Sequence, residues 1–220
     1  MITKKQLRKL TLKGWVEFES VNNDESLINI SRELGNVINH PNGQLIDYLK
    51  PKSKAEAKEN TFSYNFGHQQ FPLHTDTAFW NLPTRYVLMS CEGTSETATL
   101  FVTYDEICKI LTESELVDLK KSIFLIKTAN KNFYASLINT YENNTFLRFD
   151  RNCMKPINKS ANITLNILDE KLSELNVNKV LWDKSKIFIF DNWRILHGRE
   201  SLKNDEIRTL KRIYIKHKYL

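Results

Sequence analysis

The sequence of 220 residues is 41% hydrophobic and 11% aromatic, values that are typical of a globular domain and exclude a disordered chain. Its formal net charge is +6, from 32 basic and 26 acidic residues, but the lysines are interleaved with acidic residues, which predicts a solvated surface and no nucleic-acid partner. Three cysteines without a Cys-x-x-Cys pair argue against a disulfide framework, and no apolar stretch approaches the roughly 20 residues that span a bilayer.

The N-terminal part alternates predicted helices and strands. The spacing of apolar residues predicts helices over 3–11 and 24–34 and strands over 13–19 and 44–49. Gly35 matches a helix stop, and the residue types of 40–43 predict a turn. Residues 51–60 are polar and charged without a large apolar side chain, so we predict a mobile loop that could act as an active-site lid.

Short apolar segments dominate the rest of the chain. Strands are predicted over 85–91, 99–102, 124–126, 145–149, 187–190 and 210–215. A turn is predicted over 93–97, a capping box at 112–115 begins a helix, and an amphipathic helix is predicted over 165–175. Many short strands with a few helices predict a mainly β fold with flanking helices in a single domain, residues 1–220. Without an apolar segment after the charged N-terminal residues we predict no signal peptide, and we expect a cytoplasmic protein with no membrane partner.

The segment Phe71-Pro-Leu-His-Thr-Asp-Thr-Ala-Phe-Trp80 combines an extended run with two metal-binding residue types. His74 and Asp76 are two residues apart, so on a strand their side chains point to the same face. A short apolar strand further along the chain delivers His197. Two histidines and one carboxylate, with the other positions open, form the facial triad of non-heme Fe(II) oxygenases. The alternative is a loop histidine beside a capping aspartate.

Further motifs follow in a fixed order. After the His-x-Asp pair come Thr99-Leu-Phe, then Asn192-Trp-Arg-x-Leu-His-Gly-Arg, then Arg208-x-x-x-Arg212. This order resembles the taurine dioxygenase-like (TauD/TfdA) family of Fe(II)/2-oxoglutarate-dependent oxygenases, and the resemblance runs from about Phe71 to Tyr214. It implies a double-stranded β-helix (a cupin-like jelly roll) with the metal at one open end of the barrel.

The resemblance also implies roles for these residues. His74, Asp76 and His197 would bind Fe(II) and form the catalytic centre, with 2-oxoglutarate and O2 as co-substrates. The far carboxylate of 2-oxoglutarate would be bound by Arg208, whose guanidinium matches a carboxylate with two hydrogen bonds, and by the hydroxyl of Thr99. The alternative for Arg208 is a surface ion pair with Asp205 or Glu206.

Four further residues are predicted to contact the substrate. Arg212 lies four residues after Arg208, so on a strand it faces the same way, towards an anionic group of the substrate or towards 2-oxoglutarate. Phe79 and Trp80 follow the metal-binding segment and wall the pocket or belong to the core. Arg148 is predicted to face the substrate from its own strand. Arg194 and Arg199 are interpreted as structural ion-pair residues, and His68 as structural or exposed.

We therefore expect a dioxygenase that acts on a small polar or anionic metabolite, and we make no prediction of oligomeric state. A carboxylate at Asp76, where related halogenases have a small residue, favours hydroxylation, desaturation or ring closure over halogenation. Two alternatives remain open. One is a metal-dependent hydrolase with zinc on the same three ligands, and the other is a non-catalytic basic binding module. The chain is short for the family, with 122 residues between His74 and His197, and Lys184-Ser-Lys replaces a common Gly-Asp turn.

Overall fold

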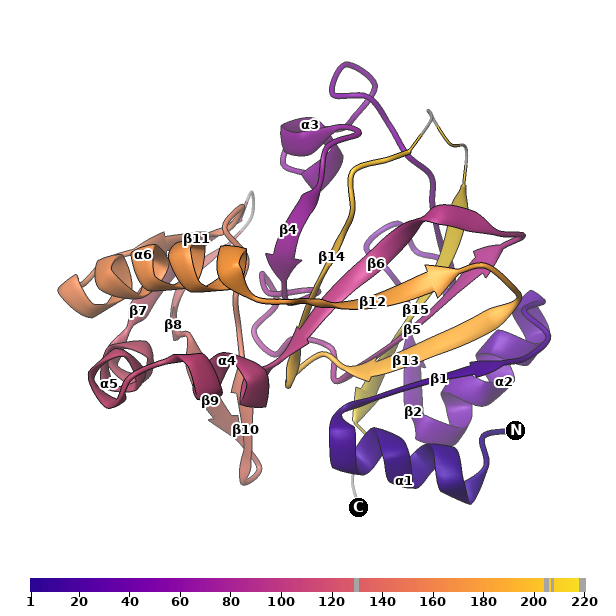
Figure 1. Ribbon diagram of the computed structural model, residues 1–220, viewed down its shortest axis with the longest axis horizontal. Coiled ribbons are helices and arrows are strands. Elements are labelled where there is room, and N and C mark those ends of the chain that lie inside the picture. Colours follow the sequence, from indigo (N-terminus) through magenta and orange to yellow (C-terminus); the bar gives the residue numbers. More distant parts are fainter. Residues whose placement is uncertain (129–130, 204–205, 207, 218–220) are drawn as a thin grey trace.

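The computed structural model describes residues 1–128, 131–203, 206 and 208–217. In this part of the chain all paired strands are antiparallel, and two sheets form a sandwich (Figure 1). The larger sheet has the order β1-β13-β5-β15-β2, with β3 also paired to β15, and contains β1 (Trp15–Glu19), β2 (Gly35–Ile38), β3 (Asp47–Leu49), β5 (Tyr86–Glu92), β13 (Lys186–Asp191) and β15 (Thr209–His217). The smaller sheet has the order β12-β6-β14-β4 and contains β4 (Phe71–His74), β6 (Ser95–Thr103), β12 (Asn178–Trp182) and β14 (Ile195–Arg199).

The period-two pattern of the strands decides which side chains fill the sandwich. Along β13, Phe188 and Phe190 point between the sheets, whereas Ile187 and Ile189 point to the opposite face. All four side chains are fully buried. Burial of each contributes roughly 1.5–3 kcal/mol, so a one-residue shift of register would expose aromatic surface and is strongly disfavoured.

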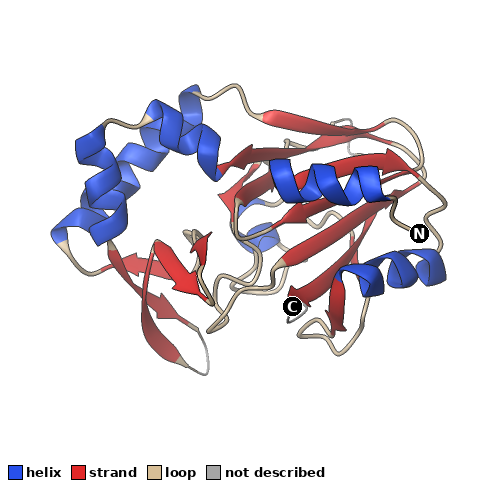
Figure 2. Ribbon diagram, turned by 90° about the horizontal axis from the view of Figure 1, so that it is seen from below, coloured by secondary structure: helices blue, strands red, loops and turns tan. Residues whose placement is uncertain are grey.

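Two N-terminal helices cover the outer face of the larger sheet. These are α1 (Lys4–Lys13) and α2 (Asp24–Leu34), and Figure 2 shows both against the strands. α1 begins at a capping box on Thr3 and ends at Gly14, whose φ of 80° suits glycine. Leu10 and Leu27 are buried against the outward-facing isoleucines of the sheet. The sequence pattern therefore places the helices on the face that the aromatic residues do not use.

A second lobe packs on the outer face of the smaller sheet. Val102 of β6 and Leu196 of β14 belong to its core. The lobe contains α4 (Tyr104–Ile110), α5 (Glu113–Lys121), α6 (Lys159–Glu174), β7 (Ile123–Lys127), β8 (Asn132–Ser136), β9 (Ile138–Tyr141), β10 (Asn144–Leu147) and β11 (Met154–Pro156). Among the described residues, no helix is long and apolar enough to cross a membrane.

Most predicted elements are confirmed, with four local differences. The predicted helix over 165–175 begins earlier, because Asn158 accepts a hydrogen bond from the backbone N–H of Ala161 and caps the helix there. The turn predicted over 93–97 is shorter, since β6 already begins at Ser95 and pairs with β12. Gly35 ends α2, as predicted, and also begins β2, where a Cβ atom would lie 2.1 Å from the carbonyl oxygen of Lys216. The sequence also gave no indication of α3 (Phe62–Phe66).

Candidate metal centre

Three side chains from distant parts of the sequence converge inside the open end of the sandwich. His74 is the last residue of β4 and pairs in register with His197 of β14. One ligand atom from each of His74, Asp76 and His197 lies within 4.8 Å of the other two. All three residues are buried, with 4–6% of their surface exposed. The structure thus brings the predicted triad together.

Asp76 reaches the site from a turn and not from the strand. The sequence analysis placed His74 and Asp76 on one strand with their side chains on the same face. The strand is wrong for Asp76, because β4 ends at His74 and Asp76 lies in the turn that follows. The side chain of Asn192 replaces a neighbouring strand: its Oδ1 accepts from the backbone N–H of Asp76 at 2.8 Å, and its Nδ2 donates to the Asp76 carbonyl at 3.0 Å. Nδ2 also donates to the carbonyl of Thr84 at 2.9 Å, so Asn192 fixes both ends of the turn.

The hydrogen bonds leave ligand atoms available. Nδ1 of His74 lies 2.9 Å from the carbonyl oxygen of Pro72, which assigns the proton to Nδ1 and leaves Nε2 with its lone pair. Nε2 of His197 lies 3.4 Å from Oδ2 of Asp76. This Oδ2 is buried and has no hydrogen-bond donor among the described residues. A buried carboxylate oxygen without a donor is costly, and a bound cation would satisfy it.

The electrostatics of the site favour an ionised Asp76 beside a neutral His197. Burial by itself raises the pKa of Asp76, but Arg212, the two neighbouring histidines and the hydrogen bond from Tyr214 together outweigh it, and the pKa falls to about 2. Burial, with His74 close by, lowers the pKa of His197 to about 3. At neutral pH the triad therefore offers one negative carboxylate and unprotonated imidazole, which is the form that binds a divalent metal ion.

The two residues predicted for 2-oxoglutarate also lie inside the sandwich. Arg208 is 4% exposed and donates from Nη1 to the carbonyl of Thr97 at 2.5 Å. Oγ1 of Thr99 accepts from the indole of Trp182 at 3.1 Å, so its own proton is available to donate. Arg208 is thus not a surface residue. Among the described residues, no carboxylate lies within 4.0 Å of it, and Asp205 lies outside those residues.

Arg212 lies directly beside the triad. Nη1 donates to Oδ1 of Asp76 at 2.8 Å, and Nη2 donates to Oδ2 of Asp47 at 2.9 Å. The hydroxyl of Tyr214 donates to the same Oδ1 at 3.0 Å. Arg212 and Tyr214 are on one face of β15, and the expectation that Arg212 shares the face of the metal site is met.

The remaining predicted substrate contacts belong to the turn after the triad. Phe79 is 40% exposed, and Trp80 is half-buried with its ring at 5.9 Å from that of Tyr214. Arg148 is buried and donates to the backbone carbonyls of Ala78, Trp80 and Asn81. Burial lowers the pKa of Arg148 to about 10. Its guanidinium thus supports the turn that carries both aromatic residues.

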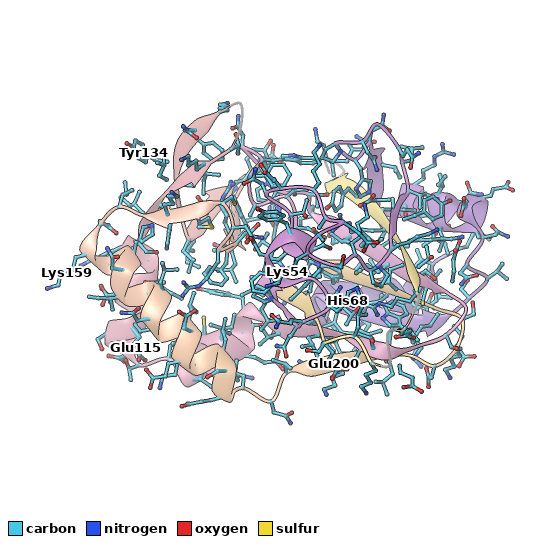
Figure 3. The ribbon with its side chains drawn as sticks, turned by 90° about the horizontal axis from the view of Figure 1, so that it is seen from above. Lys54, His68, Glu115, Tyr134, Lys159 and Glu200 are labelled. Atoms are coloured by element: carbon cyan, nitrogen blue, oxygen red, sulfur yellow. The ribbon has the colours of Figure 1, made fainter. Side chains whose placement is uncertain are left out.

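The other singled-out residues lie away from the triad. Arg194 donates to the carbonyls of Thr11 and Leu12 at the end of α1, and it pairs with Asp105 at 3.7 Å. Arg199 binds the carbonyls of Gly67 and Gln69, and its guanidinium lies 3.7 Å from the ring centre of Phe71, so it fixes the turn before β4. His68 is not in the triad; Figure 3 shows it at the surface beside Lys54 and Glu200.

Several residues at the site were missed by the sequence analysis. Phe62 of α3 stacks over His74, with 4.1 Å between ring centres. Asp150 is buried, and burial raises its pKa although His74 lies within electrostatic range. Asp47 and Tyr214 were unassigned, as was His40, whose ring stacks on Tyr214 at 3.9 Å. For two of these residues the sequence offered a signal, which was spacing along a strand: Tyr214 follows Arg212 by two residues, and Asp150 follows Arg148 by two.

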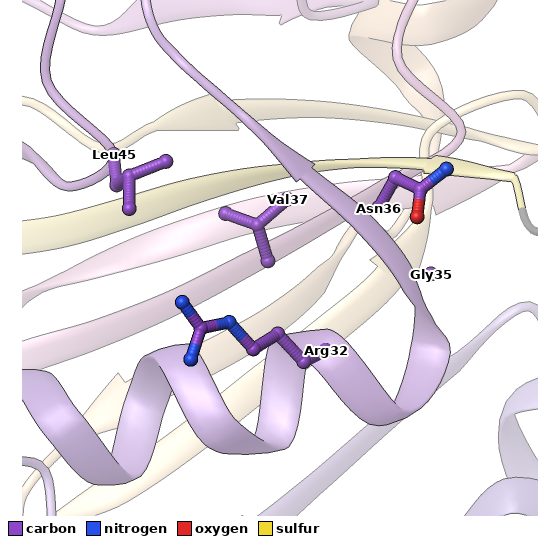
Figure 4. Close-up of a pocket in the computed structure, with 5 residues that line it drawn as sticks. All are labelled: Arg32, Gly35, Asn36, Val37 and Leu45. Atoms are coloured by element: carbon purple, nitrogen blue, oxygen red, sulfur yellow. The ribbon is translucent and has the colours of Figure 1, made fainter.

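Two cavities lie away from the triad. One cavity of about 510 Å³ lies between α2 and β2, and Figure 4 shows its lining of Arg32, Gly35, Asn36, Val37 and Leu45. A second, of about 210 Å³, lies between the end of α6 and the outer face of the smaller sheet. Neither cavity is lined by a triad residue.

The comparisons with known proteins give similar folds only. No family model matches the sequence, and a search of the curated proteins finds no significant match. An asparagine oxygenase in complex with Fe(II), 2S,3S-3-hydroxyasparagine and succinate has a TM-score of 0.80 at 14% identity, with 97% of this chain and 78% of that chain covered. PvcB, an Fe, alpha-ketoglutarate dependent oxygenase from an isonitrile synthetic pathway, has a TM-score of 0.72 at 19% identity, with 97% and 80% covered.

A variant of the non-heme iron oxygenase OrfP in complex with (3S)-hydroxy-L-Arg has a TM-score of 0.72 at 16% identity, and the alignment covers 96% of this chain and 78% of that chain. Identities this low show the fold and nothing finer. The predicted fold class is confirmed: the chain has the mainly antiparallel jelly roll, with flanking helices, that these oxygenases share.

Proposed function

We propose that this chain is an Fe(II)- and 2-oxoglutarate-dependent dioxygenase that hydroxylates an unactivated C–H bond of a small polar or anionic metabolite. One observation carries the proposal: His74, Asp76 and His197 converge in a buried site where Oδ2 of Asp76 has no donor among the described residues. Two histidines and one carboxylate with open positions suit Fe(II). The likeness in fold to several iron oxygenases supports the same reaction class.

The chain's own residues would bind and orient the reactants. The triad would hold Fe(II), and Arg208 with Thr99 would bind the far carboxylate of 2-oxoglutarate. When bound together, Fe(II), 2-oxoglutarate and O2 supply the oxidising chemistry, with one oxygen atom entering the product alcohol, the other entering succinate, and CO2 released. Because Arg208 is buried without a carboxylate within 4.0 Å among the described residues, an anionic ligand would offset the cost of its burial.

An amino acid derivative fits the groups around the triad. Asp150 adds a buried carboxyl within electrostatic range of His74, which suits a cationic part of a substrate. Phe79 and Trp80, supported by Arg148, would wall the pocket. Two of the similar structures contain hydroxylated amino acids, 3-hydroxyasparagine and 3-hydroxyarginine. We propose that one domain carries the whole reaction.

The alternatives account for fewer of these observations. A zinc hydrolase on the same ligands would give no role to the buried guanidinium of Arg208. A non-catalytic basic binding module would give no role to a buried triad, since basic binding surfaces present exposed lysine and arginine side chains.

The experiment is a turnover assay. Protein loaded anaerobically with Fe(II) is mixed with 2-oxoglutarate, O2 and a panel of amino acids and sulfonates, and succinate is measured. We expect succinate above the uncoupled background with one class of substrate. His74→Ala and His197→Ala should abolish Fe(II) binding and turnover, because two remaining ligands rarely hold this ion. Full activity in either variant would refute the assignment.

A further inference from the structure

The two carboxylate oxygens of Asp76 have unlike surroundings. Oδ1 accepts two hydrogen bonds, from Nη1 of Arg212 at 2.8 Å and from the hydroxyl of Tyr214 at 3.0 Å. Oδ2 accepts none from the described residues and faces Nε2 of His197 at 3.4 Å. Two donors, one of them charged, occupy the lone pairs of Oδ1, so only Oδ2 is free to bind a metal ion.

We infer that Arg212, Tyr214 and Asp47 form a carboxylate clamp that positions Asp76 as a ligand through one oxygen. The inference rests on the proposed metal site and adds a role for three residues. Groups that hydrogen-bond a metal ligand fix its orientation and tune its affinity. A carboxylate held in this way occupies one coordination position, which leaves more of them for 2-oxoglutarate and O2.

Asp47 holds the guanidinium from its other side. Arg212 pairs with Asp47 in the register of β15 and β3, and Nη2 donates to Oδ2 of Asp47 at 2.9 Å. The guanidinium is therefore shared between two carboxylates, each bound by one terminal nitrogen. Nε of Arg212 is buried and has no partner among the described residues. An anionic substrate group could replace these contacts only by leaving Asp47 or Asp76 unpaired.

Tyr214 is held so that its hydroxyl points at Asp76. Its ring stacks on His40, with ring centres 3.9 Å apart, and meets the edge of Trp80 at 5.9 Å. The phenol hydroxyl donates its proton to Oδ1 of Asp76 at 3.0 Å. The sequence analysis predicted that Arg212 contacts the substrate. In the clamp, Arg212 instead orients the metal ligand Asp76, so the two roles predict different results when Arg212 is replaced.

The test uses Co(II) as a probe of the metal site. Calorimetry measures Co(II) binding, and absorption spectroscopy records the spectrum of bound Co(II). Both measurements are made without 2-oxoglutarate or substrate. Under the clamp, Tyr214→Phe and Arg212→Met lower Co(II) affinity by about 10-fold or more. Their Co(II) spectra also change, because the freed Oδ1 can join the coordination sphere. Asp47 contacts Asp76 only through Arg212. Asp47→Asn therefore gives the same spectral change with a smaller loss of Co(II) affinity.

Tyr48→Phe is the matched control, since Tyr48 also donates to an aspartate, Asp24, but on the outer face of the same sheet. It should leave affinity and spectrum unchanged. Thermal unfolding of each apo variant shows whether it is folded, and Tyr214→Phe keeps the test valid if Arg212→Met does not fold.

Wild-type Co(II) affinity and spectrum in folded Tyr214→Phe would overturn the clamp, as would an Arg212→Met variant that binds Co(II) normally and loses only substrate affinity. A wild-type protein that binds Co(II) but makes no succinate would refute the proposed reaction while leaving the clamp intact. A wild-type protein that binds no Co(II) would overturn both.

Discussion

At the scale of single residues, the site depends on buried polar atoms whose partners are distant in the sequence. Asn192 is fully buried, and its amide makes three hydrogen bonds to the backbone around Asp76. Without this side chain, the buried backbone N–H of Asp76 would lose its hydrogen bond, while the carbonyl of Asp76 would keep the one from the hydroxyl of Thr77. Buried hydrogen bonds contribute about 1 kcal/mol each, and an unsatisfied partner costs more.

We therefore expect Asn192→Ala to lower the free energy of unfolding by about 3 kcal/mol, measured by urea denaturation. Co(II) affinity should fall as well, because Asp76 loses its fixed position. Asn144→Ala is the control, since Asn144 begins β10 and its side-chain amide donates to the carbonyl of Glu142, far from the triad in sequence. Equal stability of the Asn192 and Asn144 variants would mean that the amide does not fix the turn.

His40 gives a pH-dependent prediction. Its ring is 3% exposed, and burial, with Arg212 close by, lowers its pKa from 6.5 to about 4. In the unfolded chain the ring takes up a proton near pH 6.5, but in the folded protein it does so only near pH 4. Stability from the neutral ring is therefore complete above pH 6.5 and is lost as the pH falls towards 4.

His40→Phe retains an aromatic ring against Tyr214 and removes this titration. Between pH 7 and pH 4 the wild type should lose about 3 kcal/mol more stability than the variant, as measured by denaturation at each pH. Other groups that titrate in this range, such as His197, cancel in the difference. Parallel pH profiles for the two proteins would show that His40 is solvated when folded.

The spacing of His74 and Asp76, with the order of the later motifs and their resemblance to a known family, predicted roles for the triad, Arg208 and Arg212. The sequence analysis could not assign Asp47 or Tyr214. Their contacts depend on the pairing of β3 with β15 and on burial, and both depend on parts of the chain that are distant in sequence. Arg148 illustrates the same limit: a strand arginine was predicted to face the substrate, but its guanidinium binds three backbone carbonyls.

At the scale of elements, α3 covers the metal site. Thr61 caps α3, and Phe62 places its ring 4.1 Å from that of His74 and 5.6 Å from that of Phe71. Gly67 ends the helix, and a Cβ atom there would lie 3.0 Å from the side chain of Lys54, so the polar loop packs against the end of α3 (Figure 3). Loop and helix together thus lie over the His74 side of the triad.

We therefore predict that the lid expected for residues 52–60 also includes Phe62. Hydrogen exchange over residues 52–66 should slow when Fe(II), 2-oxoglutarate and the true substrate are all present, because lids exclude water during the reaction. Phe62→Ala should raise uncoupled succinate formation, whereas Phe66→Ala, which removes a ring 6.2 Å from Phe62 and not in contact with His74, should do so less. Equal exchange with and without substrate would make the loop a solvated connection.

Long elements were predicted well and short ones poorly, for a physical reason. The 24–34 helix and the 187–190 strand have a full apolar pattern, which is the signal that decides secondary structure. The five-residue α3 and the three-residue β11 are too short to show a period, and they are stabilised by aromatic stacking and strand pairing. The position of Asp76 outside its strand was missed because the amide of Asn192 stands in for a neighbouring strand.

At the scale of the whole molecule, the sandwich brings together residues that are 123 positions apart. The pairing of β4 with β14 sets His74 beside His197, while β15 crosses the larger sheet and delivers Arg208 and Arg212 from the opposite wall. Metal ligands and basic residues thus come from facing sheets. The space between them is where a small dianion bridging metal and guanidinium would lie.

The most direct measurement is an anaerobic titration of the Fe(II)-loaded protein with 2-oxoglutarate, followed by the visible charge-transfer absorption that 2-oxoglutarate produces when it chelates Fe(II). We predict a saturable absorption band in the wild type. Arg208→Met should need about 10- to 100-fold more 2-oxoglutarate, since charged hydrogen bonds contribute about 1.5–3 kcal/mol. Arg151→Met, which removes a surface ion pair with Asp169, should match the wild type. A wild type without the band, or an unchanged requirement in Arg208→Met, would contradict the account.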